Sequence, residues 1–65
     1  MKLEMIRKQK GIKQQEIADA TGVSISAVSH WESGRYKPSV ENLIKIAEVL
    51  QCSIDELLAD SEMDK

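Results

Sequence analysis

Hydrophobic residues recur every three or four positions along most of this chain, which is the spacing of one face of an α-helix. The clearest run joins Leu43, Ile46, Ala47 and Leu50, and it predicts an amphipathic helix over 40–50. Shorter runs of the same kind predict helices over 2–10, 14–21, 24–33 and 53–58. No segment alternates as a half-buried strand does, so the sequence predicts a compact all-α fold of five helices.

Residues 14–33 hold two of these helices, separated by a turn at Gly22. Ala18 is small where a second helix has to cross closely, and Gly22 adopts a positive φ cheaply, so the chain can reverse direction there. Trp31 lies three residues after Val28 on the inward face, so we interpret it as a core residue rather than a base-stacking one. The arrangement is typical of a helix-turn-helix that offers its second helix to the major groove.

The length and composition limit the class of protein. A chain of 65 residues allows one domain, which we place at 1–60, followed by a polar tail at 61–65. A single cysteine excludes an internal disulfide, and neither a signal peptide nor a membrane-spanning run is visible, so we expect a cytoplasmic protein. We expect neither enzyme activity nor a cofactor, because the chain has no paired nucleophile and base and no phosphate-binding glycine loop.

Charge is divided unevenly along the chain, although the net charge is −2. Residues 1–38 carry seven basic and four acidic side chains, a net charge of +3, whereas residues 39–65 carry two basic and seven acidic ones, a net charge of −5. The positive half contains the predicted helix-turn-helix, as a nucleic-acid-binding surface requires. Uneven charge is also common in small proteins that bind no nucleic acid, so this feature alone does not decide the function.

A resemblance to a known family covers residues 3–58. The chain resembles the phage-repressor and Cro-like class of helix-turn-helix proteins, often called the XRE family, in the ordered motifs IRKQKGI, QQEIADATGVSISAVSHWESGRYKPS and ENLIKIAEVLQCSIDELL. The resemblance implies a lambda-repressor-like domain that binds double-stranded DNA in a sequence-specific manner and regulates transcription, in the manner of a repressor. It also implies a bacterial or phage origin.

The family's base-reading positions fall on the outward face of helix 24–33, at Ile25, Ser26, Ser29 and His30. Serine discriminates weakly between base edges, and Ile25 offers apolar contact that suits a thymine methyl group. His30 is therefore the strongest candidate for a directional hydrogen bond, with an ordinary surface histidine as the alternative. A metal-binding role for His30 is disfavoured, since no histidine or cysteine lies at ligand spacing.

A second set of residues is suited to the phosphate backbone. Arg35, Tyr36 and Lys37 place two cations around a planar hydrogen-bonding side chain, which positions a protein on DNA without reading sequence. Lys13 precedes the predicted helix start at residue 14, where phosphates bind well, but its side chain cannot accept the usual capping hydrogen bond. By resemblance, Gln14 also contacts phosphate, and Ser24 and Ser33 lie near the DNA backbone; a solvated surface is the alternative for all of these residues.

Two further expectations concern partners. The resemblance implies an ion pair between Arg7 and Glu32, which would explain an acidic residue beside the DNA surface. Because one arginine-poor helix covers few base pairs, we expect a homodimer on a pseudo-palindromic site, with Ile54, Leu57 or Leu58 as candidate contacts. The rival hypothesis is a protein-interaction or antitoxin-like module that uses the same fold and binds its partner through the acidic C-terminal half.

Overall fold

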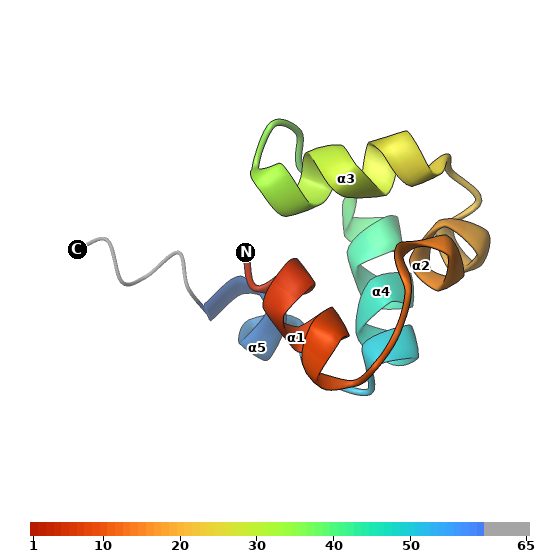
Figure 1. The fold of residues 1–65 in the computed structure, drawn as a ribbon. Helices are drawn as coiled ribbons and strands as arrows, with labels where there is room; N and C mark the ends of the chain where they lie inside the picture. Colours follow the sequence, from red (N-terminus) through yellow and green to blue (C-terminus); the bar gives the residue numbers. More distant parts are fainter. Residues whose placement is uncertain (60–65) are drawn as a thin grey trace.

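The computed structural model describes residues 1–59 and contains five helices and no strand in that range (Figure 1). They are α1 (Leu3–Gln9), α2 (Gln14–Thr21), α3 (Ile25–Ser33), α4 (Val40–Leu50) and α5 (Ile54–Leu58). The predicted all-α fold is confirmed, and each helix begins and ends within one residue of its predicted range. The predicted domain end at residue 60 and the polar tail at 61–65 lie outside the described residues.

The helices pack around a single apolar core. Helix α2 contacts both α3 and α4, while α1 contacts α3 and α4 contacts α5. Figure 1 shows α3 across one end of the molecule and α5 at the other, with α4 running between them. Every helix contributes at least one side chain that is completely buried, and these are Leu3, Ile17, Val28, Ile46, Leu50 and Leu57. Each such burial stabilises the fold by about 1.5–3 kcal/mol, so the core holds α3 in a fixed position.

Trp31 and Ala18 lie where the sequence places them. Trp31 is only 7% exposed and packs in the core, which confirms that it is not available for base stacking. Ala18 is 2% exposed in the contact between α2 and its neighbours. Gly22 ends α2 in a left-handed conformation with a φ of 75°, as the predicted chain reversal requires.

Leu57 requires a correction. The prediction that it could form a dimer contact is wrong, because its side chain is completely buried in the core of the monomer. Its helix is also held in place by the Lys2 backbone N–H, which donates a hydrogen bond to the Leu57 carbonyl oxygen at 2.7 Å. Leu58, the next residue, is 37% exposed, and Ile54 is half-buried.

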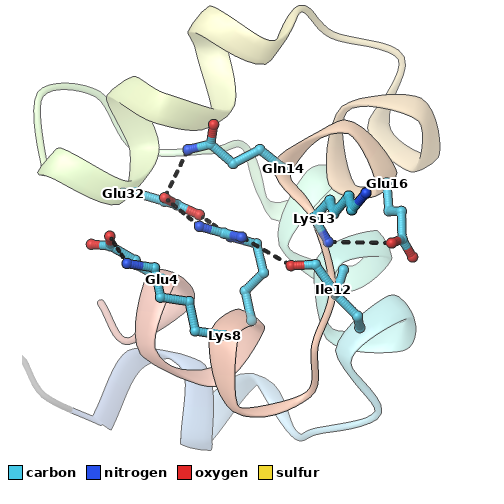
Figure 2. Close-up of polar contacts among 8 residues, drawn as sticks. Glu4, Lys8, Ile12, Lys13, Gln14, Glu16 and Glu32 are labelled. Carbon is cyan, nitrogen blue, oxygen red and sulfur yellow. Dashed lines mark hydrogen bonds and ion pairs between the residues drawn. The ribbon is translucent and has the colours of Figure 1, made fainter.

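The helix starts follow from short side-chain acceptors. Ser24, Ser39 and Ser53 each accept a hydrogen bond from the backbone N–H three residues later, which caps α3, α4 and α5. Helix α2 lacks such a cap because Lys13 precedes it. There the Glu16 carboxylate accepts from the Lys13 backbone N–H at 3.2 Å, which supplies half of a capping box (Figure 2).

Cys52 is half-buried against the core just after α4. Burial and the Glu56 carboxylate raise the pKa of the Cys52 thiol, against an opposing effect of the Lys10 ammonium. The raised pKa favours the unreactive protonated thiol, so Cys52 acts as a small, largely apolar residue beside the core.

Gln51 ends α4 in the left-handed region, with a φ of 56° and a ψ of 47°. Among residues 1–59 it is the one non-glycine residue with a positive φ. We expect Gln51→Gly to raise the free energy of unfolding by about 0.5–1 kcal/mol, because glycine adopts this conformation without steric cost. Urea denaturation followed by Trp31 fluorescence measures the change.

The control for Gln51→Gly is Ala20→Gly, which introduces the same residue at an exposed position inside α2. This variant should lose about 1 kcal/mol of stability, since glycine is unfavourable within a helix. A loss of stability in both variants would show that the end of α4 does not need a left-handed residue.

Candidate nucleic-acid interface

The outward face of α3 carries the predicted base-reading residues. Ile25, Ser26 and Ser29 are exposed, Ile25 to 43%, and His30 is half-buried. The hydroxyls of Ser26 and Ser29 form no hydrogen bond with any residue of the described range 1–59. The structure thus brings the four predicted residues onto one surface, and among residues 1–59 the two serine hydroxyls there have no hydrogen-bond partner.

His30 differs from the other three because it has a neighbour. Its ring lies edge-on against the ring of Tyr36, with a distance of 5.2 Å between ring centroids and an interplanar angle of 78°. Tyr36 comes from the loop after α3, and it remains 58% exposed. This contact could not be predicted from the sequence, since the two residues are six positions apart and are brought together by the chain reversal after α3.

The loop after α3 places its cations beside the reading face. Gly34 reverses the chain with a φ of 85°, and the Arg35 backbone N–H then donates to the His30 carbonyl oxygen at 2.9 Å. The side chains of Arg35 and Lys37 are exposed, as is that of Lys13 at the start of α2. Positive charge therefore flanks the helix-turn-helix at two separate points of the chain.

The two serines at the ends of α3 are both engaged. Ser24 accepts the capping hydrogen bond from the Ala27 N–H at 3.1 Å, which leaves its own hydroxyl hydrogen available to a phosphate. Ser33 instead donates its hydroxyl to the His30 carbonyl oxygen at 3.1 Å. A donated hydrogen bond from Ser33 to a phosphate would require that internal bond to break.

Glu32 is the centre of a polar network beneath this surface. The Arg7 guanidinium donates from Nε to Glu32 Oε2 at 2.6 Å and from Nη2 to Glu32 Oε1 at 3.3 Å. The two side chains are only 11% and 5% exposed, respectively. The implied ion pair is therefore present, and it joins α1 to the end of α3.

Two more groups complete the network (Figure 2). Arg7 Nη1 donates to the Ile12 carbonyl oxygen at 2.9 Å, and Gln14 Nε2 donates to Glu32 Oε1 at 2.9 Å. The bond from Gln14 was not foreseen, and it fixes one amide hydrogen while the second stays available to a phosphate. Because Arg7 neutralises Glu32, the acidic residue of α3 does not repel an anionic ligand at this surface.

Other kinds of site find little support in the described residues. Within residues 1–59, no three His, Cys, Asp or Glu side chains are grouped so that they could hold a metal ion. No helix in the same range is both long and apolar enough to cross a membrane.

The fold and this surface define a helix-turn-helix domain, and comparison with known families shows the same class. A helix-turn-helix family model matches residues 3–57, so the chain belongs to this family. The resemblance to phage repressors and Cro-like proteins is confirmed by the match and by the relatives described next.

Three relatives have names that state a regulatory role. The chain is 39% identical over 62 residues to the transcriptional activator BcrR of Enterococcus faecalis, across 95% of this chain and 30% of that protein. It is 48% identical over 44 residues to the cryptic phage CTXphi repressor RstR of Vibrio cholerae, across 68% of this chain and 39% of that protein. Repressor protein C2 of Salmonella phage P22 is 42% identical over 52 residues, across 80% of this chain and 24% of that protein.

A solved structure supports the fold independently. The crystal structure of a transcriptional regulator from Listeria innocua superposes with a TM-score of 0.76 at 38% identity, and it covers 85% of this chain and 51% of that one. The chain thus spans about a quarter to a half of the length of these proteins. The shared part is the helix-turn-helix domain.

Proposed function

We propose that this chain binds double-stranded DNA in a sequence-specific manner and regulates transcription as a repressor. The observation that carries the proposal is the outward face of α3, where Ile25, Ser26 and Ser29 are exposed and where, within residues 1–59, the hydroxyls of the two serines form no hydrogen bond. Exposed side chains on the second helix of a helix-turn-helix are suited to base edges in the major groove.

The residues around this face have separate roles in the proposal. Ile25 contacts a thymine methyl group, Ser26 and Ser29 add weak hydrogen bonds, and His30 supplies the directional one. Lys13, Arg35 and Lys37 bind phosphates as cations, and Gln14 and Ser24 add neutral donors. The names of the relatives as regulators and repressors support the same function.

We further propose that the protein acts as a homodimer. One recognition helix without arginine reads few base pairs, and two copies would read half-sites about 34–36 Å apart. With Leu57 in the core, the exposed Leu58 and the half-buried Ile54 remain as candidate contacts on α5. Sedimentation of the protein alone and with DNA would give the stoichiometry.

The experiment that tests the function is the selection of bound duplexes from a random DNA pool, followed by titration of the selected duplex at two salt concentrations. We expect a short pseudo-palindrome, with affinity that falls steeply as salt rises. His30→Ala should then lower the affinity for that sequence by about 5- to 150-fold for each half-site, the range for one good base contact, and relax specificity at one base pair of each half-site.

The absence of any enriched sequence, with a protein shown to be folded, would contradict the proposal. It would favour the second candidate, a protein-interaction module. The observation in favour of that alternative is that α4 and α5 carry both exposed apolar and exposed acidic side chains; on α4, Val40 is 71% and Ile44 45% exposed.

A further inference from the structure

We propose that Tyr36 is a positioning residue that orients the His30 imidazole for base reading, and that it is not primarily a phosphate contact. The inference deepens the proposed function and rests on it, since it assigns a specificity role within the same surface. It starts from the one ring contact in the described part of the chain, the edge-on packing of His30 against Tyr36 at 5.2 Å.

The backbone ties the same two residues together. The His30 carbonyl oxygen accepts from the Arg35 N–H at 2.9 Å and from the Tyr36 N–H at 3.5 Å, and it also accepts from the Ser33 hydroxyl at 3.1 Å. The left-handed Gly34 makes this possible, because it folds the chain back over the last turn of α3. Tyr36 is therefore anchored to His30 at the main chain as well as at the ring.

A fixed neighbouring ring can set the orientation of the His30 imidazole. Rotation about the bond to an aromatic ring has broad minima, so a free surface imidazole points its two nitrogens in many directions. A base edge accepts or donates only along particular directions, and a side chain that is already oriented loses less conformational entropy on binding. The edge-to-face arrangement favours one ring orientation through the quadrupole of the aromatic ring.

The chemistry of tyrosine separates this role from the alternative. Positioning of His30 uses the ring of Tyr36, whereas a phosphate contact uses its hydroxyl as a hydrogen-bond donor. Tyr36→Phe keeps the ring and removes the hydroxyl, and Tyr36→Ala removes both. Both variants are expected to fold, because the Tyr36 side chain is mostly exposed and lies outside the core cluster.

The experiment compares Tyr36→Phe, Tyr36→Ala, His30→Ala and the double alanine variant on the selected duplex and on duplexes with one changed base pair. We expect the affinity and the discrimination of Tyr36→Phe to stay within about twofold of those of the original protein. Tyr36→Ala should lower discrimination by about two- to tenfold, the value of one aromatic pair, at the base pair that His30→Ala affects. The double variant should discriminate no worse than His30→Ala alone.

Lys37→Ala is the matched control from the same loop, and it should lower affinity equally on all duplexes without changing discrimination. If Tyr36→Phe behaves like this control, the hydroxyl binds phosphate and the inference is overturned. It is also overturned if Tyr36→Ala leaves discrimination unchanged.

A measurement without DNA distinguishes failure of the inference from failure of the proposed function. In the free protein, Tyr36→Ala should shift the NMR signals of the His30 ring protons, because the neighbouring aromatic ring is removed, while Tyr36→Phe should leave them nearly unchanged. Unchanged His30 signals in Tyr36→Ala overturn the inference alone. Failure of the original protein to select any duplex overturns the proposed function, whatever the NMR result.

Discussion

Replacing Arg7 with alanine is expected to lower the free energy of unfolding by about 3–5 kcal/mol. The loss arises because the Glu32 carboxylate, whose side chain is 5% exposed, would keep its charge in a buried position without its cationic partner. The Ile12 carbonyl oxygen would also lose the hydrogen bond that it accepts from Arg7. Urea denaturation monitored by circular dichroism measures the change, which is comparable with the entire stability of many small domains.

The chain offers a matched control for Arg7→Ala in an exposed ion pair. Lys8 and Glu4 lie on the same helix, with 3.0 Å between Lys8 Nζ and Glu4 Oε2 (Figure 2). Their side chains are 65% and 51% exposed, respectively. Lys8→Ala should therefore cost about 0.5 kcal/mol or less. Equal losses in the two variants would contradict the importance that we assign to the buried pair.

A double substitution tests the physical reason for the expected loss. Arg7→Met combined with Glu32→Leu removes both charges and refills the space with apolar atoms, which is often neutral or stabilising for a buried pair. We expect this variant to be clearly more stable than Arg7→Ala. If both are equally unstable, the loss comes from packing rather than from an unpaired carboxylate.

The second large effect is expected in DNA binding. Replacing Lys13, Arg35 and Lys37 with glutamine should make the slope of log affinity against log salt shallower by about 2.7 for each protomer, from three phosphate contacts at about 0.9 each. At about 0.1 M salt the affinity should fall by about two to three orders of magnitude for each protomer. The reduction should be nearly uniform across DNA sequences, because phosphates carry no base information.

The control for this charge effect removes cations from another part of the molecule. Lys8 and Lys10 lie at the C-terminal end of α1, and Lys10 is close enough to Cys52, after α4, to affect its pKa. Their replacement with glutamine should leave the salt slope nearly unchanged. The variant to compare with it carries glutamine at Arg35 and Lys37 only, because both double variants then change the net charge by the same amount. An equal response of the two double variants would show that only the overall charge of the protein matters.

The same substitutions distinguish the two candidate functions. A partner protein that binds through the acidic C-terminal half would be little affected by the loss of Lys13, Arg35 and Lys37, which lie outside that half. A protein that binds DNA through α3 would lose affinity and salt dependence together.

Most of the fold could be predicted from the sequence because its signals are local. Apolar spacing along Leu43, Ile46 and Leu50 identified α4, and the caps that the structure shows at Ser39 and Ser53 involve residues only three positions apart. The end of α4 is also local, since Gln51 there adopts a left-handed conformation. Each of these features depends on residues within one or two helical turns of one another.

The features that could not be predicted depend on how separate segments meet. Leu57 and Leu58 are adjacent and chemically identical, and only the packing of α5 decides that the first is buried and the second exposed. The bond between Gln14 and Glu32 requires the start of α2 to meet the end of α3. The ion pair between Arg7 and Glu32 was anticipated through family resemblance, since nothing in the spacing of 25 residues indicates it.

The outward and inward faces of α3 are formed by different residues, which makes the domain suitable for directed redesign. Ile25, Ser26 and Ser29 are exposed on α3, while its inward residues Val28 and Trp31 belong to the core. A combinatorial library restricted to the three outward positions would therefore keep a common scaffold, and most of its members should unfold at similar temperatures. If the proposed function holds, variants that prefer new DNA sequences could be selected from such a library without further stabilisation of the fold.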